Sequence, residues 1–125
     1  MIKVVVFGSR GFSDYHTLET KLDQYLSRVS MLDDITIISG TARGADSLGE
    51  LYAKNKGYAV EQYPADWKQY GKKAGMIRNR EMASVANYAV GFWNGVSMGT
   101  KGMIAILESM NVPTRVVIYH ESSRF

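Results

Sequence analysis

Three short stretches of the chain combine glycine with hydroxyl or cationic side chains, a composition suited to holding a phosphate. They are Gly8–Phe12, Ser39–Asp46 and Asn94–Lys101. Glycine allows a backbone to approach a ligand closely and to adopt positive φ angles. The second and third stretches lead directly into segments of helical periodicity, and a helix start presents unpaired N–H groups to an anion. The stretches therefore predict a binding site for a phosphate-bearing small molecule.

Each stretch follows a short apolar segment, which predicts that strands position all three. Apolar strands alternating with helical segments are typical of a parallel sheet covered on both faces. The expected strands are Ile2–Phe7, Ile35–Ile38, Ala59–Tyr63, Tyr88–Trp93 and Arg115–Tyr119. The expected helices are one capped by Ser13 or Asp14 and carrying Leu18 to Val29, then Ala42–Lys56, residues 73–86 and Gly99–Met110.

The pattern predicts one α/β domain over residues 1–125. We expect a Rossmann-like three-layer sandwich of five parallel strands in the order 3-2-1-4-5, with helices on both faces. In such folds ligands bind at the carboxyl ends of the strands, where all three stretches would lie. The polar tail, Glu121–Phe125, is expected to fray.

Composition narrows the functional classes. The 125 residues include no cysteine, which excludes a disulfide framework and a cysteine nucleophile. No segment has the length of a membrane span or the pattern of a signal peptide, so we expect a cytoplasmic protein without a membrane partner. We see no metal-ligand cluster, with His16 and His120 outside the three stretches, and we expect no cofactor.

Charge is distributed unevenly along the chain. The net charge is +3, but residues 1–66 carry seven basic and nine acidic side chains, whereas residues 67–125 carry eight basic and three acidic ones. The densest basic segment runs from Lys68 to Arg80 without an acid. Such a segment is either a solvated helix face or an attractant for phosphate.

Two common nucleotide-binding motifs are absent. The dinucleotide pattern G-x-G-x-x-G does not follow the first strand, and the second strand ends in Ser39 rather than in an acid that could hold a ribose. Gly99-Thr100-Lys101 has the residues of a P-loop in the wrong order. A standard NAD(P) dehydrogenase and a P-loop ATPase are therefore disfavoured.

The motifs together resemble the YspA-like branch of the SLOG superfamily, a Rossmann-like fold related to the LOG and DprA proteins. The resemblance extends over about residues 3 to 119 and also rests on Pro64–Trp67, Ala74–Met82 and Phe92–Gly95. It implies binding of a nucleotide or a nucleotide derivative, such as an ADP-ribose-like ligand, in a bacterial or phage protein.

The candidate ligand-binding residues come from the three stretches and from the segment between them. The start of the last helix would hold a phosphate, Arg43 would add a bidentate contact, and Asp46 would accept from ribose hydroxyls or complement its helix dipole. Trp67 is a candidate for stacking on a base. The full set is Gly8, Ser9, Arg10, Gly11, Ser39, Gly40, Thr41, Arg43, Gly44, Asp46, Trp67, Arg78, Asn79, Arg80, Asn94, Gly95, Ser97, Gly99, Thr100 and Lys101.

Two arginines of this set are two positions apart. Arg78 and Arg80 lie about 200° apart around a regular helix, so both cannot point into one pocket. One would face the ligand while the other pairs with an acid or a second subunit. We nevertheless expect Thr100→Val or Arg80→Ala to abolish ligand binding without unfolding the chain.

Two further activities remain open alongside binding alone. LOG relatives cleave the N-glycosidic bond of nucleotides and carry a glutamate three residues beyond the threonine of the last glycine-rich turn, where this chain has Met103. Arg80, Glu81 and Asp46 are the remaining catalytic candidates. DprA relatives bind single-stranded DNA, for which the Lys68–Arg80 segment with Tyr63, Trp67 and Tyr70 would serve.

We therefore expect a nucleotide-binding sensor or sequestering protein whose partner is a nucleotide-like small molecule. A nucleotide N-glycosidase is the alternative, and the low net charge makes nucleic-acid binding a weaker one. A homo-oligomer is compatible with the sequence.

Overall fold

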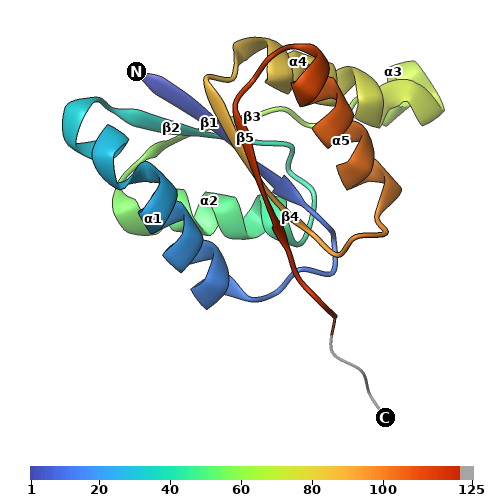
Figure 1. Ribbon diagram of the computed structural model, residues 1–125. Coiled ribbons are helices and arrows are strands. Elements are labelled where there is room, and N and C mark those ends of the chain that lie inside the picture. The colour runs from blue at the N-terminus through green and yellow to red at the C-terminus, as the bar shows by residue number, and fades with distance from the viewer. Residues whose placement is uncertain (122–125) are drawn as a thin grey trace.

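The computed structural model describes residues 1–121, which form a five-stranded sheet covered by helices (Figure 1). All pairings are parallel, and the order across the sheet is β3-β2-β1-β4-β5. The bounds are β1 Ile2–Gly8, β2 Ile35–Ser39, β3 Ala59–Gln62, β4 Tyr88–Trp93 and β5 Thr114–Ile118. The predicted α/β class, layer arrangement and strand order are confirmed.

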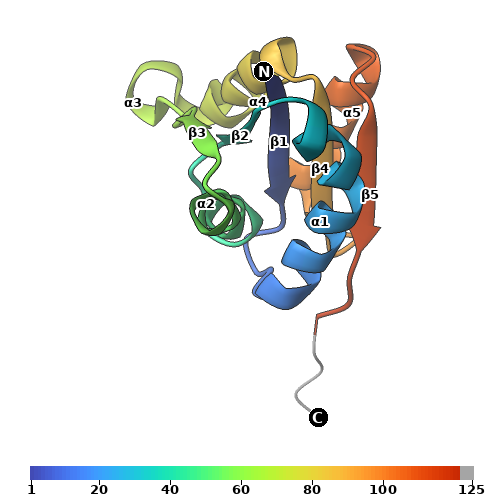
Figure 2. The same ribbon diagram turned by 90° about the vertical axis from the view of Figure 1, so that its left-hand side faces the viewer.

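Two pairs of helices cover the two faces of the sheet (Figure 2). They are α1 Tyr15–Leu32 with α2 Ala45–Lys56, and α4 Ala74–Val85 with α5 Met98–Ser109. Successive side chains of β1 point to opposite faces, as in any strand. Val4 and Val6 pack in the core cluster shared with α1 and α2, whereas Val5 and Phe7 pack in the cluster shared with α4 and α5.

The direction in which the chain crosses the sheet reverses at β1. The chain adds β2 and β3 on one side of β1 and then returns to place β4 and β5 on the other. The crossovers after β1 and after β4 therefore leave the sheet towards opposite sides. This divergence opens a crevice at the carboxyl ends of β1 and β4.

Local sequence fixes the helix ends on the α1–α2 face. Asp14 caps α1, because its carboxylate accepts from the Thr17 N–H at 3.0 Å and from the Thr17 hydroxyl at 2.6 Å. Gly57 ends α2 with φ 76°, a left-handed conformation that costs glycine little. Both caps agree with the sequence-based expectation.

The segments around the carboxyl edge differ from their predicted boundaries. α2 begins at Ala45 rather than at Ala42, since Thr41 (φ 65°) and Gly44 (φ 80°) have backbone angles outside the helical region. A short helix α3 (Trp67–Tyr70) and a 3₁₀ turn (Gly71–Lys73) precede α4 and were not predicted. Asp66 accepts from the Gln69 N–H at 3.1 Å and so caps α3. The first helix was expected to carry its apolar residues as far as Val29, and α1 continues to Leu32. The remaining boundaries agree with the prediction to within one residue.

Three further features concern the sheet edges, the C-terminal segment and the helices. β3 and β5 are the edge strands and are more exposed than the three central strands. Glu121, within the segment expected to fray, accepts a hydrogen bond from Asn94 Nδ2 at 2.9 Å, whereas the rest of that tail lies outside the described residues. No helix within residues 1–121 is both long enough and apolar enough to cross a membrane.

Candidate functional site

A cavity of about 610 Å³ opens at the carboxyl edge of the sheet, between the ends of β1 and β4 and the helices α4 and α5. Its volume lies within the range of small-molecule sites in proteins, roughly 300–1,000 Å³. It is lined by Phe7, Gly8, Ser9, Arg10, Gly11, Ala42, Asp46, Trp67, Lys72, Gly75, Met76, Arg78, Asn79, Met82, Asn94, Ser97, Met98, Gly99, Thr100, Gly102, Met103 and Ile106.

The loops after β1 and β2 are held together by their backbones. Gly44 lies so close to the first loop that a Cβ at this position would stand 2.5 Å from the Ser9 carbonyl oxygen and 2.6 Å from that of Arg10. The N–H of Ala45 donates to the Ser9 carbonyl at 3.4 Å. Only glycine combines φ 80° with this close approach, so Gly44 fixes Arg10 beside the start of α2.

The loops after β1 and β4 are joined by Ser9 and Asn94. The buried Ser9 hydroxyl accepts from the Asn94 N–H at 3.2 Å. The Asn94 side-chain oxygen in turn accepts from the N–H groups of Val96 at 3.0 Å and Ser97 at 2.8 Å. These bonds shape the turn so that the first residues of α5 face the cavity.

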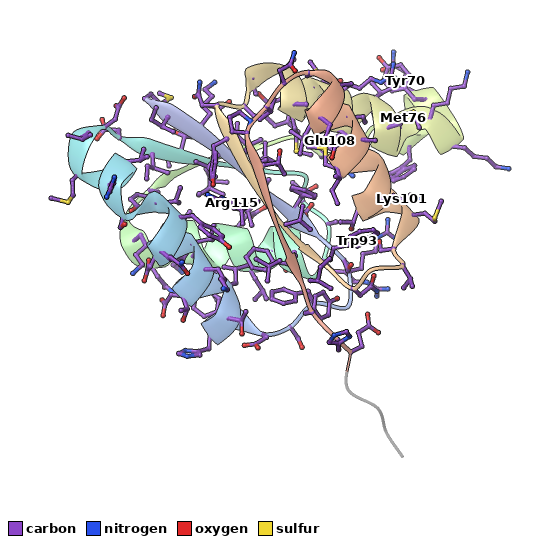
Figure 3. The ribbon with its side chains drawn as sticks, viewed as in Figure 1. Tyr70, Met76, Trp93, Lys101, Glu108 and Arg115 are labelled. Atoms are coloured by element: carbon purple, nitrogen blue, oxygen red, sulfur yellow. The ribbon has the colours of Figure 1, made fainter. Side chains whose placement is uncertain are left out.

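The start of α5 supplies polar groups to the cavity. The first N–H groups of a helix have no intrahelical acceptor, and here they belong to Met98, Gly99 and Thr100, all of which line the cavity. The Thr100 hydroxyl is buried and lies 3.2 Å from the Ser97 hydroxyl. Trp93 Nε1 donates to the Ser97 carbonyl at 3.0 Å and supports the turn from outside (Figure 3).

Asp46 and Arg78 form the charged part of the cavity wall beside β2. Asp46, in the first turn of α2, is 7% exposed and accepts from the Ala42 N–H at 3.2 Å. Burial raises the pKa of Asp46 to about 6, while the Ala42 bond and the Arg78 charge act in the opposite direction. The Arg78 guanidinium donates to the carbonyls of Gly40 and Tyr63 through Nη1. Burial lowers the pKa of Arg78.

The opposite part of the cavity wall is apolar. Phe7, Met82 and Met103 are buried there, with Ile106 partly buried beside them. Met76 is exposed at the rim on α4 (Figure 3). Thioethers and an aromatic ring offer polarisable contacts to the faces of a flat ring. Met103 occupies the position at which the LOG pattern has its glutamate, so this wall carries no carboxylate.

A second cavity of about 340 Å³ adjoins the first. Arg10, Ala42, Trp67 and Arg78 line both cavities. The residues that line only the second are Gly40, Thr41, Arg43, Pro64 and Ala65. The ends of β2 and β3 therefore form a smaller compartment beside the one at β1 and β4.

The structure brings most of the expected ligand residues to these two cavities. The main cavity contains Gly8, Ser9, Arg10, Gly11, Asp46, Trp67, Arg78, Asn79, Asn94, Ser97, Gly99 and Thr100, and the second adds Gly40, Thr41 and Arg43. Ser39, Gly44, Arg80, Gly95 and Lys101 line neither. Ser39 and Gly44 instead hold the loops, because Ser39 Oγ donates to Glu50 at 2.6 Å and accepts from the Thr41 N–H at 3.1 Å.

The catalytic candidates are separated by the structure. Asp46 lies in the main cavity, whereas Arg80 and Glu81 are exposed on α4 and line neither cavity. Arg78 faces inward and Arg80 faces solvent, as their spacing on one helix requires. Because Arg78 lines the cavities and Arg80 does not, we expect Arg78→Ala, rather than Arg80→Ala, to remove binding.

Sequence reasoning missed the apolar lining and Lys72. The missed residues are Phe7, Ala42, Lys72, Gly75, Met76, Met82, Met98, Gly102, Met103 and Ile106 in the main cavity, with Pro64 and Ala65 in the second. A usable signal was present, since Gly75, Arg78, Asn79 and Met82 recur at helical spacing, as do Gly99, Gly102, Met103 and Ile106. Each set marks one helix face turned towards the carboxyl edge.

The fold is Rossmann-like with a cavity at its carboxyl edge, and comparison with known proteins identifies the family of the chain. The family model described as "YspA, cpYpsA-related SLOG family" matches residues 2–70. The chain is also 33% identical over 119 residues to the Gene 61 protein of Mycobacterium phage D29, covering 90% of this chain and 94% of that protein. The chain therefore belongs to the YspA, cpYpsA-related SLOG family. No solved structure matched it.

Membership of this family supports a nucleotide-related function in general. The phage relative also agrees with the bacterial or phage setting that the resemblance implied. The match ends at residue 70, so it includes the cavity lining that follows β1 and β2, whereas the lining from α4 and α5 lies beyond it.

Proposed function

We propose that this chain binds a nucleotide in the main cavity and acts as a sensor or sequestering protein in the cytoplasm. The observation that carries the proposal is the division of one cavity wall into three chemically distinct parts. These are the start of α5, the Asp46–Arg78 pair, and the apolar wall containing Phe7 and Met103.

Each part suits one component of a nucleotide. The N–H groups of Gly99 and Thr100, with the Thr100 hydroxyl, suit a phosphate at the positive end of the α5 dipole. The Asp46 carboxylate is a strong acceptor for ribose hydroxyls. The apolar wall suits the face of a base, and Trp67, which is 54% exposed at the rim, offers a second aromatic surface.

The composition of the wall favours binding over N-glycosidic cleavage. Cleavage of this kind needs a carboxylate that stabilises positive charge at the sugar or moves a proton. Asp46 is the one carboxylate among the described residues that line the main cavity. The thioether of Met103 cannot perform either role. An intact nucleotide is therefore the expected end state.

The experiment identifies the ligand and its fate together. The purified protein is incubated with AMP, GMP, ADP-ribose, NAD and cyclic nucleotides and then desalted, and retained and released molecules are identified by mass spectrometry. We expect one nucleotide to be retained intact, with no free base. Release of free base would instead support a hydrolase, with Asp46 as its first candidate.

A matched pair of variants assigns the site. Thr100→Val removes the hydroxyl at the start of α5 with little change of shape, whereas Thr20→Val makes the same change on the exposed side of α1. Because the N–H groups at the start of α5 remain in the variant, we expect Thr100→Val to raise the Kd by about tenfold rather than to abolish binding, as for loss of one charge-assisted hydrogen bond. Thr20→Val should leave the Kd unchanged. Equal affinities for both variants and the wild type would contradict this assignment of the cavity.

A further inference from the structure

The second cavity has an unusual charge composition. Three arginines, Arg10, Arg43 and Arg78, line it together with Trp67, and its lining contains no acid. Arg10 and Arg43 are exposed, and neither makes an ion pair with the residues that the structure describes. Guanidinium groups gathered in this way repel one another. Burial is the main cause of the lowered pKa of Arg78, the charge of Asp46 opposes it, and the charge of Arg10 lowers the pKa further. An anion placed among them relieves this repulsion.

The donors of Arg78 are only partly used within the chain. Its Nη1 donates to the carbonyls of Gly40 and Tyr63, and its Nε donates to Asn79 Oδ1 at 3.0 Å. These bonds hold the guanidinium in place at the boundary of the two cavities. Its Nη2 has no hydrogen-bond partner among residues 1–121, so a rigidly held donor remains for a ligand.

The loop that carries Arg43 is fixed in a strained conformation. Thr41 has φ 65°, which is uncommon for a threonine and costs energy unless the surroundings enforce it. Ser39 Oγ enforces it by accepting from the Thr41 N–H at 3.1 Å while donating to Glu50. The Gly40–Arg43 segment is therefore pre-organised around the second cavity without any ligand.

The two cavities adjoin each other and extend in opposite directions along the edge of the sheet. The main cavity includes the loop after β4, and the second includes the loops after β2 and β3, on the other side of β1. Neighbouring strands in a sheet lie about 4.8 Å apart, so the ends of β4 and β2, from which the start of α5 and the loop with Arg43 follow, are separated by roughly 10 Å. Two adjacent phosphates of a diphosphate are too close together to reach both places. A ribose between two phosphates gives the larger spacing.

We infer that the second cavity binds a second phosphate group, one separated from the first by the ribose. The preferred ligands are then nucleotides phosphorylated on both sides of the sugar, that is, nucleoside 3′,5′-bisphosphates and 5′-phosphorylated dinucleotides. This inference rests on the proposed function, because the first phosphate is placed at the start of α5 and the ribose at Asp46. Arg10, Arg43 and Arg78 bind the second phosphate.

Calorimetric titration with three nucleotides tests the inference. The probes are AMP, ADP and adenosine 3′,5′-bisphosphate at one ionic strength. We expect the bisphosphate to bind about tenfold more tightly than AMP, as for one additional bidentate arginine contact. ADP should bind within about threefold of AMP, because its second phosphate stands next to the first. Equal gains for ADP and the bisphosphate would overturn the inference.

Arg43 provides the matched variant because it lines only the second cavity. Arg43→Gln should reduce the advantage of the bisphosphate over AMP to less than about threefold and leave the Kd for AMP unchanged. Arg28→Gln removes the same charge from the exposed side of α1 and should preserve the full advantage. If Arg43→Gln leaves the advantage of the bisphosphate over AMP unchanged, the second phosphate does not bind in the second cavity, and the proposed function still stands. Absence of binding by all three nucleotides and by GMP, GDP and guanosine 3′,5′-bisphosphate would overturn both.

Discussion

The carboxylate of Asp46 and the guanidinium of Arg78 both lie against Gly40, in space that the side chain of any larger residue would occupy. A Cβ at position 40 would lie 2.8 Å from Asp46 Oδ2 and 2.8 Å from Arg78 Nη1. Asp46 is held by the Ala42 N–H, and Arg78 is held by the Gly40 and Tyr63 carbonyls. The loops after β2 and β3 are thereby tied to these two charged side chains beside the boundary of the two cavities.

Gly40→Ala should displace this pair. The new methyl group has to move at least one of the two side chains, and both are held by hydrogen bonds. We expect a loss of about 1–3 kcal/mol in the free energy of unfolding, typical of overpacking, together with loss of nucleotide binding. Urea denaturation and calorimetry measure the two effects.

Gly102→Ala is the matched control for the stability measurement. A Cβ at Gly102 meets no atom within 4 Å, and the residue lies inside α5. Alanine in a helix interior is more stable than glycine by roughly 0.5–1 kcal/mol. A Gly40→Ala protein as stable as wild type, with unchanged affinity, would show that the Asp46–Arg78 pair does not define the site.

Asp46→Asn should separate stability from binding. Burial raises the folded-state pKa of Asp46 from 3.8 to about 6, so ionisation of this carboxyl destabilises the folded protein. This cost is absent below pH 3.8, grows between 3.8 and 6 and is complete above about pH 6, where it reaches at most about 3 kcal/mol. The variant should therefore be more stable than wild type at pH 8, and by about half as much at pH 5.

The same variant should bind nucleotide less well, because an amide oxygen is a weaker acceptor for ribose hydroxyls than a carboxylate. Urea denaturation at the two pH values and calorimetry at pH 8 test both statements. Asp34→Asn, on the exposed loop before β2, controls for the loss of one negative charge. A variant less stable than wild type at pH 8 would mean that the Arg78 charge outweighs the effect of burial.

Trp67 should report ligand binding by fluorescence. It is 54% exposed and lines both cavities, whereas Trp93 is partly buried and its Nε1 bonds to the Ser97 carbonyl. A base or sugar placed against the exposed indole changes its emission. We expect a saturable change on nucleotide addition, and we expect Trp67→Phe to abolish it and weaken binding by a few-fold. A change that persists in Trp67→Phe would place the ligand away from the boundary of the cavities.

Salt dependence should distinguish a small ligand from single-stranded nucleic acid. Lys68, Lys72 and Lys73 lie exposed on α3 and the following turn, in the same short segment as the exposed Trp67 and Tyr70. When a protein contacts Z phosphates of a single strand, a plot of log K against log salt concentration has a slope of about −0.7Z. For the nucleotide we expect this slope to be shallower than about −2, and we expect no tight complex with a 20-nucleotide strand. A steep slope and tight binding of the strand would favour nucleic acid.

The architecture was readable from the sequence because its signals are local. The apolar segments at Val4 and Ile37 and the cap at Asp14 are each set by a few neighbouring residues. The backbone of the loop after β2 was less predictable. Thr41 and Gly44 leave the helical region because of contacts with Ser39 and with the loop after β1, which come from distant parts of the fold.

The site was predicted in its polar part and missed in its apolar part. The glycines and hydroxyl groups that follow Gly8 and Asn94 predict a phosphate site by their residue types alone. Met82 and Met103 resemble ordinary core residues in the sequence, and only the placement of α4 against α5 turns them towards one cavity. The second cavity depends on Arg10, Arg43 and Arg78, which are far apart in the chain and whose convergence no spacing reveals.

The most direct test of the account is a ¹H–¹⁵N titration of the wild-type protein with the retained nucleotide. The account predicts saturable shifts, with one Kd, in the amides of Met98, Gly99 and Thr100 at the start of α5 and of Ala42 beside Asp46. Amides on the exposed side of α1 should stay unchanged. Shifts confined to the Lys68–Lys73 segment, with the start of α5 unaffected, would contradict the central claim that the nucleotide phosphate binds at α5.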